Sequence, residues 1–157
     1  MQTAIINTPI GLLELKGTSE GLVSVVFLNE EAVTSTTIPE VLVVAVTQLQ
    51  EYFKRKRKDF TIPLSIAGTS FQQKVWNELC TIPYGKTASY LQIAKQIGDP
   101  KVIRAAASAN GKNPISIIIP CHRIIGSDGS LTGYAGGLHR KKWLLEHESP
   151  YTQGTLF

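Results

Sequence analysis

The first 66 residues alternate apolar runs with turn residues, as an antiparallel sheet does. The apolar runs 4–6, 12–15 and 22–28 are separated by Thr8-Pro9-Ile10-Gly11 and Thr18-Ser19-Glu20-Gly21, so we expect strands joined by two hairpin turns. Pro39 suits the first turn of a helix, and apolar residues then recur at helical spacing up to Phe53. A further strand is expected over residues 60–66.

A helical pattern begins after residues 67–69. Ser70 with Gln73, and Ser89 with Gln92, have the Ser-x-x-Gln spacing of a capping box, in which side chain and backbone cap the helix start reciprocally. We therefore expect one helix to begin at each serine.

The second of these helices is followed at once by another. Gly98 suits a helix end, Asp99 can cap, Pro100 fits a first helical position, and the next helix runs towards Gly111. This spacing predicts a helix-turn-helix. The second helix offers few base-reading side chains, so we favour sequence-independent docking on DNA, with tight packing of its alanines as the alternative.

Length, composition and charge narrow the class of protein. The chain has 157 residues, of which 43% are hydrophobic, and a net charge of +4; Lys and Arg exceed Asp and Glu only after residue 66. The basic cluster 139–142 is expected to be exposed on a final helix. There is no apolar stretch long enough to span a bilayer and no signal peptide, so we expect an intracellular protein. Two cysteines and three scattered histidines predict a reduced, metal-free chain.

The chemical candidate follows a β-branched run. Residues 115–119 are expected to form a buried extended segment that ends at Pro120-Cys121-His122, a thiol beside a titratable base. An unperturbed thiol with a pKa of ~8.5 is only about 3% ionised at neutral pH, so Cys121 would need activation. Adjacency of a cysteine and a histidine is weak evidence alone, because neighbours on an extended chain point to opposite faces. The other cysteine, Cys80, is expected to be a half-buried residue at a helix end, with no chemistry.

Several motifs in order, from Phe71 to Glu148, give a specific resemblance. They are Pro83-Tyr84-Gly85-Lys86-Thr87-Ala88-Ser89-Tyr90, Arg104-Ala105, Asn113-Pro114, Ile119-Pro120-Cys121-His122-Arg123-Ile124-Ile125, Gly133-Tyr134-Ala135-Gly136-Gly137-Leu138 and Trp143-Leu144-Leu145-Glu146-His147-Glu148. In these motifs the chain resembles the O6-alkylguanine-DNA alkyltransferase family. Residues 1–66 resemble only the general layout of that family's N-terminal domain.

The resemblance implies an α+β fold in two domains. Residues 1–66 would form a ribonuclease-H-like domain of sheet and helix. Residues 67–157 would form a DNA-binding, winged-helix-like alkyltransferase domain with a short C-terminal tail. The implied activity is DNA repair, by irreversible, single-turnover transfer of an alkyl group from O6-alkylguanine to Cys121, with O4-alkylthymine as a further candidate substrate.

The resemblance also assigns roles to residues. Cys121 would accept the alkyl group, and a water would link it to His122, which Glu148 orients; Tyr90 would give a proton or hydrogen bond to guanine. Arg104 would fill the gap left by the flipped nucleotide. The other DNA-binding candidates are Ser89, Lys101, Ala105 and Lys112. The substrate-pocket candidates are Asn113, Pro120, Arg123, Ile124, Tyr134 and Ala135.

Partners and departures complete these expectations. We expect a cytoplasmic monomer that binds double-stranded DNA containing O6-alkylguanine, with no cofactor and no membrane. Three positions depart from relatives, so the resemblance does not fix the substrate size preference: Ser116 stands in place of a proline, Thr132 in place of a glycine at the pocket margin, and Ala135 lacks the polar side chain found in some relatives.

Three other functions remain to be weighed. A non-enzymatic alkyltransferase-like protein would bind the lesion but lacks the reactive cysteine. A cysteine hydrolase could use Cys121 and His122, yet no second motif of such an enzyme is present. A helix-turn-helix transcription factor is disfavoured by the alanine-rich second helix.

Overall fold

The computed structural model describes residues 1–150, and the expected C-terminal tail lies outside them. The chain forms two compact units: residues 1–67 with 114–116, and residues 68–113 with the chain from Ile117 onwards. Strands dominate the first unit and helices the second, which confirms the predicted α+β class. No helix in the described part is long and apolar enough to cross a membrane.

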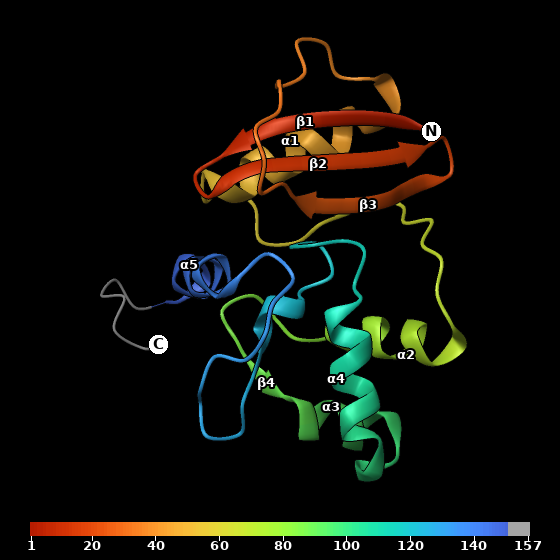
Figure 1. Cartoon of the computed structure of the whole chain (residues 1–157), viewed down its shortest axis with the longest axis vertical. Helices are drawn as coiled ribbons and strands as arrows, with labels where there is room; N and C mark the ends of the chain where they lie inside the picture. The colour runs from red at the N-terminus through yellow and green to blue at the C-terminus, as the bar shows by residue number, and fades with distance from the viewer. Residues whose placement is uncertain (151–157) are drawn as a thin grey trace. The chain divides into compact units, whose positions relative to one another are not determined.

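The first unit is built on an antiparallel sheet of β1 (Gln2–Thr8), β2 (Gly11–Thr18) and β3 (Gly21–Phe27), in that order (Figure 1). The three predicted strands are thus confirmed. Alternate residues of β2, such as Leu13 and Leu15, are buried, as expected for a sheet with one covered face. A register shift at Lys16/Gly17 inserts one extra residue into β3, so Leu22 and Val25 both reach the core despite their odd spacing.

A helix packs on this sheet. The 3-10 turn η1 (Glu40–Leu42) follows Pro39 and leads into α1 (Val43–Phe53), which lies along one face of the sheet (Figure 1). Leu42, Leu49 and Tyr52 of this segment are fully buried. Their burial confirms the helix predicted from apolar periodicity.

The strand predicted over residues 60–66 is wrong. Only Leu64 pairs, through a single bridge to Leu22, and the backbone bonds run from Leu22 N to Pro63 O and from Ser65 N to Leu22 O. Pro63 has no N–H to donate, so the ladder cannot continue through it. The segment is an extended connection beside β3.

The second unit contains the helix-turn-helix. The two helices of this motif are α3 (Tyr90–Ile97) and α4 (Ile103–Gly111), with the 3-10 turn η2 (Pro100–Val102) immediately before α4. The helix α2 (Ser70–Leu79) precedes them. Gly98 ends α3 with φ of 116°, a left-handed conformation that suits glycine, and the Asp99 side chain accepts from Lys101 N. Both boundary predictions are confirmed. Trp76 on α2 is buried and donates Nε1–H to Ala109 O on α4 at 2.9 Å.

Capping boxes begin α2 and α3. Ser89 and Gln92 cap α3 as predicted, with Gln92 N donating to Ser89 Oγ at 3.1 Å and Ser89 N donating to Gln92 Oε1 at 2.7 Å. For α2 the predicted pair was wrong by one residue, because Thr69 and Gln72 form the box and Ser70 is already helical. The remaining elements are the short strands β4 (Ala88–Ser89) and β5 (Ile124–Ile125), the 3-10 turn η3 (Cys121–Arg123), and α5 (Leu138–Glu148).

Candidate active site

Cys121 is presented by a tight turn rather than by a strand. Cys121 N donates to Ile119 O at 2.8 Å across Pro120, whose φ of −82° and ψ of 61° are those of an inverse γ-turn. The extended segment predicted over 115–119 is wrong beyond Ile115, which makes a single bridge to Val25. Ile117 has φ of 71°, a strained left-handed conformation for a β-branched residue, and this reverses the chain.

After the turn, β5 holds the cysteine segment in place. Ile124 and Ile125 pair in parallel with Ala88 and Ser89 of β4. Because Ser89 also caps α3, the segment that follows Cys121 is tied directly to the start of the helix-turn-helix. The thiol and the DNA-binding candidates therefore belong to one unit.

Burial governs the thiol of Cys121. Only 5% of the residue is exposed, and burial raises its pKa to about 11, although a hydrogen bond with the Asn113 side chain and the Lys141 charge act in the lowering direction. Asn113 also donates Nδ2–H to Ile119 O at 2.8 Å. The thiol is thus neutral at rest, and alkylation chemistry would need a base to take its proton.

A candidate base lies next in the chain. His122 is fully buried, and its Nε2 is 2.7 Å from Glu148 Oε2 on α5. An ionised Glu148 fixes the hydrogen on Nε2, which leaves the Nδ1 lone pair as the basic site. Nδ1 has no hydrogen-bond partner among residues 1–150. This geometry suits a proton acceptor.

Glu148 is held ionised by two partners. Burial would raise its pKa, but His122 and Arg123 outweigh burial and hold the pKa well below the ordinary value. Arg123 donates from Nε to Glu148 Oε1 at 2.7 Å and from Nη2 to Glu148 Oε2 at 3.1 Å, while its Nη1 donates to Ile82 O at 2.7 Å. Its guanidinium also lies 5.8 Å from the centre of the Tyr84 ring. The structure thus places Arg123, a predicted pocket residue, in a buried clasp on Glu148.

The expectation that residues 139–142 are exposed is wrong for two of them. His139 and Lys142 are exposed, but Arg140 and Lys141 are buried. Arg140 donates to Gly136 O at 3.0 Å, and Lys141 Nζ donates to Thr132 O at 3.2 Å. The sequence held a usable signal, because Lys141 precedes Leu144, Leu145 and Glu148 by three, four and seven residues, the spacing of one helix face.

The DNA-binding candidates gather on and around α4. Four of them are exposed: Lys101, Arg104, Ala105 and Lys112. Ser89, which caps the start of α3, is half-buried. The alanine run is divided between two faces: Ala106 and Ala109 are buried against the other helices, while Ala105 and Ser108 face outwards. The packing interpretation is thus confirmed for the buried alanines, while docking of the exposed face on DNA stays a prediction.

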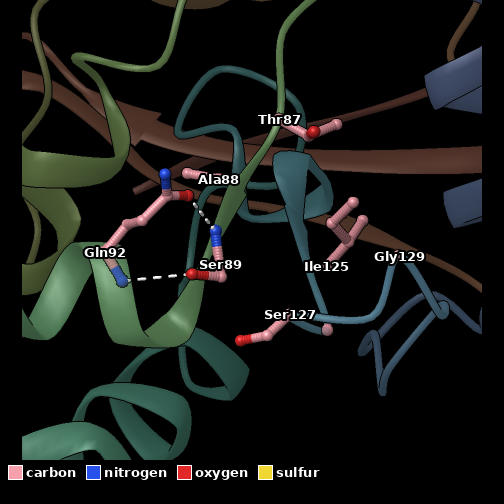
Figure 2. Close-up of a pocket in the computed structure, with 8 residues that line it drawn as sticks. Thr87, Ala88, Ser89, Gln92, Ile125, Ser127 and Gly129 are labelled. Atoms are coloured by element: carbon pink, nitrogen blue, oxygen red, sulfur yellow. Dashed lines mark hydrogen bonds between the residues drawn. The ribbon is translucent and has the colours of Figure 1, made fainter.

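The remaining pocket candidates differ in exposure. Pro120 and Ile124 are buried, Tyr134 is half-buried, and Ala135 is exposed. None of these four residues lines the open pocket of about 320 Å³ between the start of α3 and the loop after β5 (Figure 2). Its lining residues are Thr87, Ala88, Ser89, Gln92, Ile125, Gly126, Ser127 and Gly129. Cys121 does not line this pocket, which is therefore distinct from the thiol site.

No group of three or more His, Cys, Asp or Glu side chains within residues 1–150 is arranged to hold a metal ion. Both cysteines are free, with Cys80 exposed and Cys121 buried. The expectation that Cys80 is half-buried is therefore wrong, because it caps the C-terminus of α2 at the surface.

Two family models together match almost the whole chain. Residues 1–66 match the ribonuclease-like domain of 6-O-methylguanine DNA methyltransferase, and residues 70–150 match its DNA-binding domain. The methylated-DNA–protein-cysteine methyltransferase of Mycobacterium tuberculosis is 48% identical over 147 residues, covering 91% of this chain and 89% of the relative. That of Methanosarcina acetivorans is 46% identical over 155 residues, covering 94% and 98%.

Solved structures show the same similarity. The crystal structure of the M. tuberculosis O6-methylguanine methyltransferase has a TM-score of 0.84 and 47% identity, covering 94% of this chain and 92% of that one. A complex of the M. tuberculosis protein with DNA has a TM-score of 0.85 and 46% identity, covering 94% and 93%. A Methanococcus jannaschii O6-methylguanine DNA methyltransferase has a TM-score of 0.68 and 29% identity, covering 94% and 93%.

Proposed function

Because the chain belongs to the 6-O-methylguanine DNA methyltransferase family, we propose that it repairs DNA by moving an alkyl group from guanine O6 to its own Cys121. One observation carries the assignment of the acceptor. The buried thiol is followed directly by His122, a base with an open Nδ1 and a carboxylate on Nε2. Cys80 is exposed, and neither of its neighbours in the chain, Leu79 and Thr81, is a base.

The proposed reaction is a displacement at the alkyl carbon. His122 takes the thiol proton through a water, and the sulfur then forms a bond to the carbon as the bond from carbon to O6 breaks. The released electron pair passes into the guanine ring, where Tyr90 gives a proton or hydrogen bond. The product is a thioether, and because a thioether has no readily displaced group, each molecule acts once.

DNA would approach the exposed face of α4. An O6 substituent lies on the pairing edge of guanine, so the nucleotide must leave the stack before a buried thiol can reach it. Ala105 and Ser108 project little from this face and permit close approach to the DNA backbone, while the exposed Arg104 is long enough to occupy the gap. Lys101, Lys112 and Ser89 would contact phosphates around it.

Several finer points belong to the same proposal. The partner is double-stranded DNA that contains O6-alkylguanine, with O4-alkylthymine as a second substrate, and the protein works as a cytoplasmic monomer without a cofactor. Asn113, Pro120, Ile124, Tyr134 and Ala135 would form the pocket for the flipped base. Arg123 would keep Glu148 ionised and in position through its hydrogen bonds to the carboxylate. Residues 1–66 and 67–157 would be its two domains.

Intact-protein mass spectrometry tests the proposal. The protein is incubated with duplex DNA carrying one O6-methylguanine, in parallel with Cys121→Ser and the matched control Cys80→Ser. We expect one methyl group to be gained by the parent and by Cys80→Ser, and none by Cys121→Ser. Unmodified protein that still binds the lesion would indicate a lesion sensor instead, and repeated turnover of an ester would indicate a hydrolase.

Arg104→Ala tests the flipping role, with Lys101→Ala as a control that also removes one exposed cation. Arg104→Ala should slow transfer from duplex DNA at least about tenfold, because unstacking a base costs a few kcal/mol, and should leave reaction with the free O6-methylguanine base unchanged. An equal loss on both substrates would contradict gap filling.

A further inference from the structure

We propose that Lys141, held by Thr132, supplies positive charge to both ends of the transfer, at the Cys121 sulfur and at the Tyr90 hydroxyl. This inference rests on the proposed function, since it adds two residues to the same site. None of the motifs that identified the family gave Lys141 or Thr132 a role.

Lys141 is a buried cation that has only neutral hydrogen-bond acceptors around its ammonium group in the described part of the chain. The residue is fully buried on α5, although an ammonium group is costly to remove from water. Its Nζ donates to two neutral oxygens of one residue, Thr132 O at 3.2 Å and, more weakly, Thr132 Oγ1 at 3.5 Å. Lys141 is in none of the ion pairs formed by carboxylates of residues 1–150. A purely structural role would be better served by a leucine, as at Leu144 and Leu145.

The thiol of Cys121 is neutral at rest and becomes a counter-charge for Lys141 when its proton is removed. Burial lowers the pKa of Lys141 to about 8, and Cys121 acts against that lowering; Lys141 in turn lowers the pKa of the buried thiol. The interaction is reciprocal, so each group is easier to ionise when the other is charged. Lys141 therefore makes the thiolate more accessible as His122 removes the proton.

Thr132 extends this charge to Tyr90. The Tyr90 hydroxyl lies 3.0 Å from Thr132 Oγ1, and either oxygen could be the donor. When Thr132 Oγ1 accepts from Lys141, its own proton is free to point at the Tyr90 oxygen, and Tyr90 then directs its proton away from Thr132. Such a chain of hydrogen bonds polarises each member, which makes Tyr90 a stronger donor to the leaving guanine. A glycine at position 132 would offer no such link.

Several other groups influence the titration of the Cys121 thiol or lie next to it. A hydrogen bond with Asn113 and the charge of Lys141 lower the pKa of Cys121, and Cys121 in turn raises the pKa of Lys141. His122 follows Cys121 and is paired with Glu148, which Arg123 also contacts. Lys141 is thus the cation whose removal should move the thiol titration without breaking the pair between His122 and Glu148.

The first experiment measures the thiol itself and needs no DNA. In a Cys80→Ser background, the rate at which iodoacetamide alkylates Cys121 is followed by mass spectrometry as a function of pH, with Lys141 intact and in Lys141→Met and Lys141→Arg. Lys141 is charged only below its pKa of about 8, so the rates are compared at neutral pH. We expect about a tenfold lower rate in Lys141→Met, the equivalent of one pKa unit, and a rate that is largely restored in Lys141→Arg. An unchanged rate at neutral pH in folded Lys141→Met would overturn the proposal.

The second experiment tests the link to Tyr90. Thr132→Val removes the hydroxyl but keeps the carbonyl that holds Lys141, and Thr132→Ser keeps both. We expect Thr132→Val to retain the iodoacetamide rate at neutral pH and the affinity for lesion DNA but to transfer the methyl group about tenfold more slowly, the equivalent of one lost hydrogen bond, with Thr132→Ser restoring the rate. Equal rates in Thr132→Val and Thr132→Ser would overturn the link.

The two experiments also separate this inference from the proposed function. If the parent protein fails to accept a methyl group from DNA but Lys141→Met still lowers the iodoacetamide rate at neutral pH, the repair function fails and the pairing of Lys141 with Cys121 stands. If transfer occurs and that rate does not change, the repair function stands and the role of Lys141 fails.

Discussion

The buried clasp on Glu148 gives the sharpest test of what stabilises the second unit. Glu148 is only 3% exposed and receives bonds from His122 Nε2 at 2.7 Å and from Arg123 at 2.7 Å and 3.1 Å. Glu148→Gln keeps the size of the side chain but removes the charge that compensates the buried guanidinium. Removing one partner of a buried ion pair costs about 3–5 kcal/mol, so we expect a loss of that order in the free energy of unfolding.

Urea unfolding followed by tryptophan fluorescence measures this loss where it occurs. The two tryptophans of the chain, Trp76 and Trp143, both belong to the second unit. Trp143 stacks on His147, one residue from Glu148, with ring centres 4.7 Å apart. Their fluorescence therefore reports this unit and not the sheet of the first.

A double-mutant cycle shows whether the clasp or the side chain alone is responsible. Arg123→Met should cost a similar amount, and the double variant should cost less than the two single costs added together, by about 0.5–3 kcal/mol, because the second change no longer strands a charge. A loss below about 1 kcal/mol in Glu148→Gln, or strict additivity in the double variant, would refute the reasoning.

Two further predictions concern pH and backbone conformation. The pKa of Glu148 lies below its ordinary value of 4.5, so the contribution of its charge to stability is complete above that pH and is lost as pH falls further. The free energy of unfolding of the second unit, measured with urea, should therefore begin to fall between pH 5 and 3, and should fall less in Glu148→Gln. Gly98→Ala should lower the free energy of unfolding by about 1 kcal/mol or more through strain alone, because φ is 116° and no atom lies within 4 Å of the added carbon. Gly111→Ala, which also meets nothing within 4 Å but ends a helix without a left-handed φ, should be neutral or stabilising, and equal losses at both glycines would contradict this account.

Much of the fold could be predicted where a short sequence pattern is compatible with only one local structure. The strands of the first unit followed from apolar runs between turns, and Ser89, Gly98 and Asp99 marked helix ends through specific backbone bonds. The start of α2 was wrong by one residue because Thr69-x-x-Gln72 and Ser70-x-x-Gln73 are overlapping frames with the same spacing. The spacing alone does not distinguish those frames.

Two errors arose where a strand-like pattern did not become a strand, one for the local reason of a proline and one because packing overrode local preference. Residues 60–66 contain strand-forming residues, but Pro63 cannot donate to a ladder and only one bridge to Leu22 forms. The run 115–119 is β-branched, which favours an extended segment, yet Ile117 takes a left-handed conformation in the turn that leads to Cys121. Such strain persists only where surrounding packing fixes it, and it lies four residues before the proposed acceptor.

The candidate site shows a third kind of error, because a charge is ordinarily assigned to the surface. The family motifs name Cys121, His122, Tyr90 and Glu148, whereas charge alone places Lys141 in an exposed basic cluster. Its spacing to Leu144, Leu145 and Glu148 puts it on the buried face of α5, where a cation has to be compensated by chemistry in the interior. A charged residue that keeps the apolar period of its helix conflicts with the rule for cores, and such conflicts concentrate at functional sites. The spacing along α5 is therefore enough to reveal the burial of Lys141, and this buried charge motivates the role that we propose for it beside Cys121 and Tyr90.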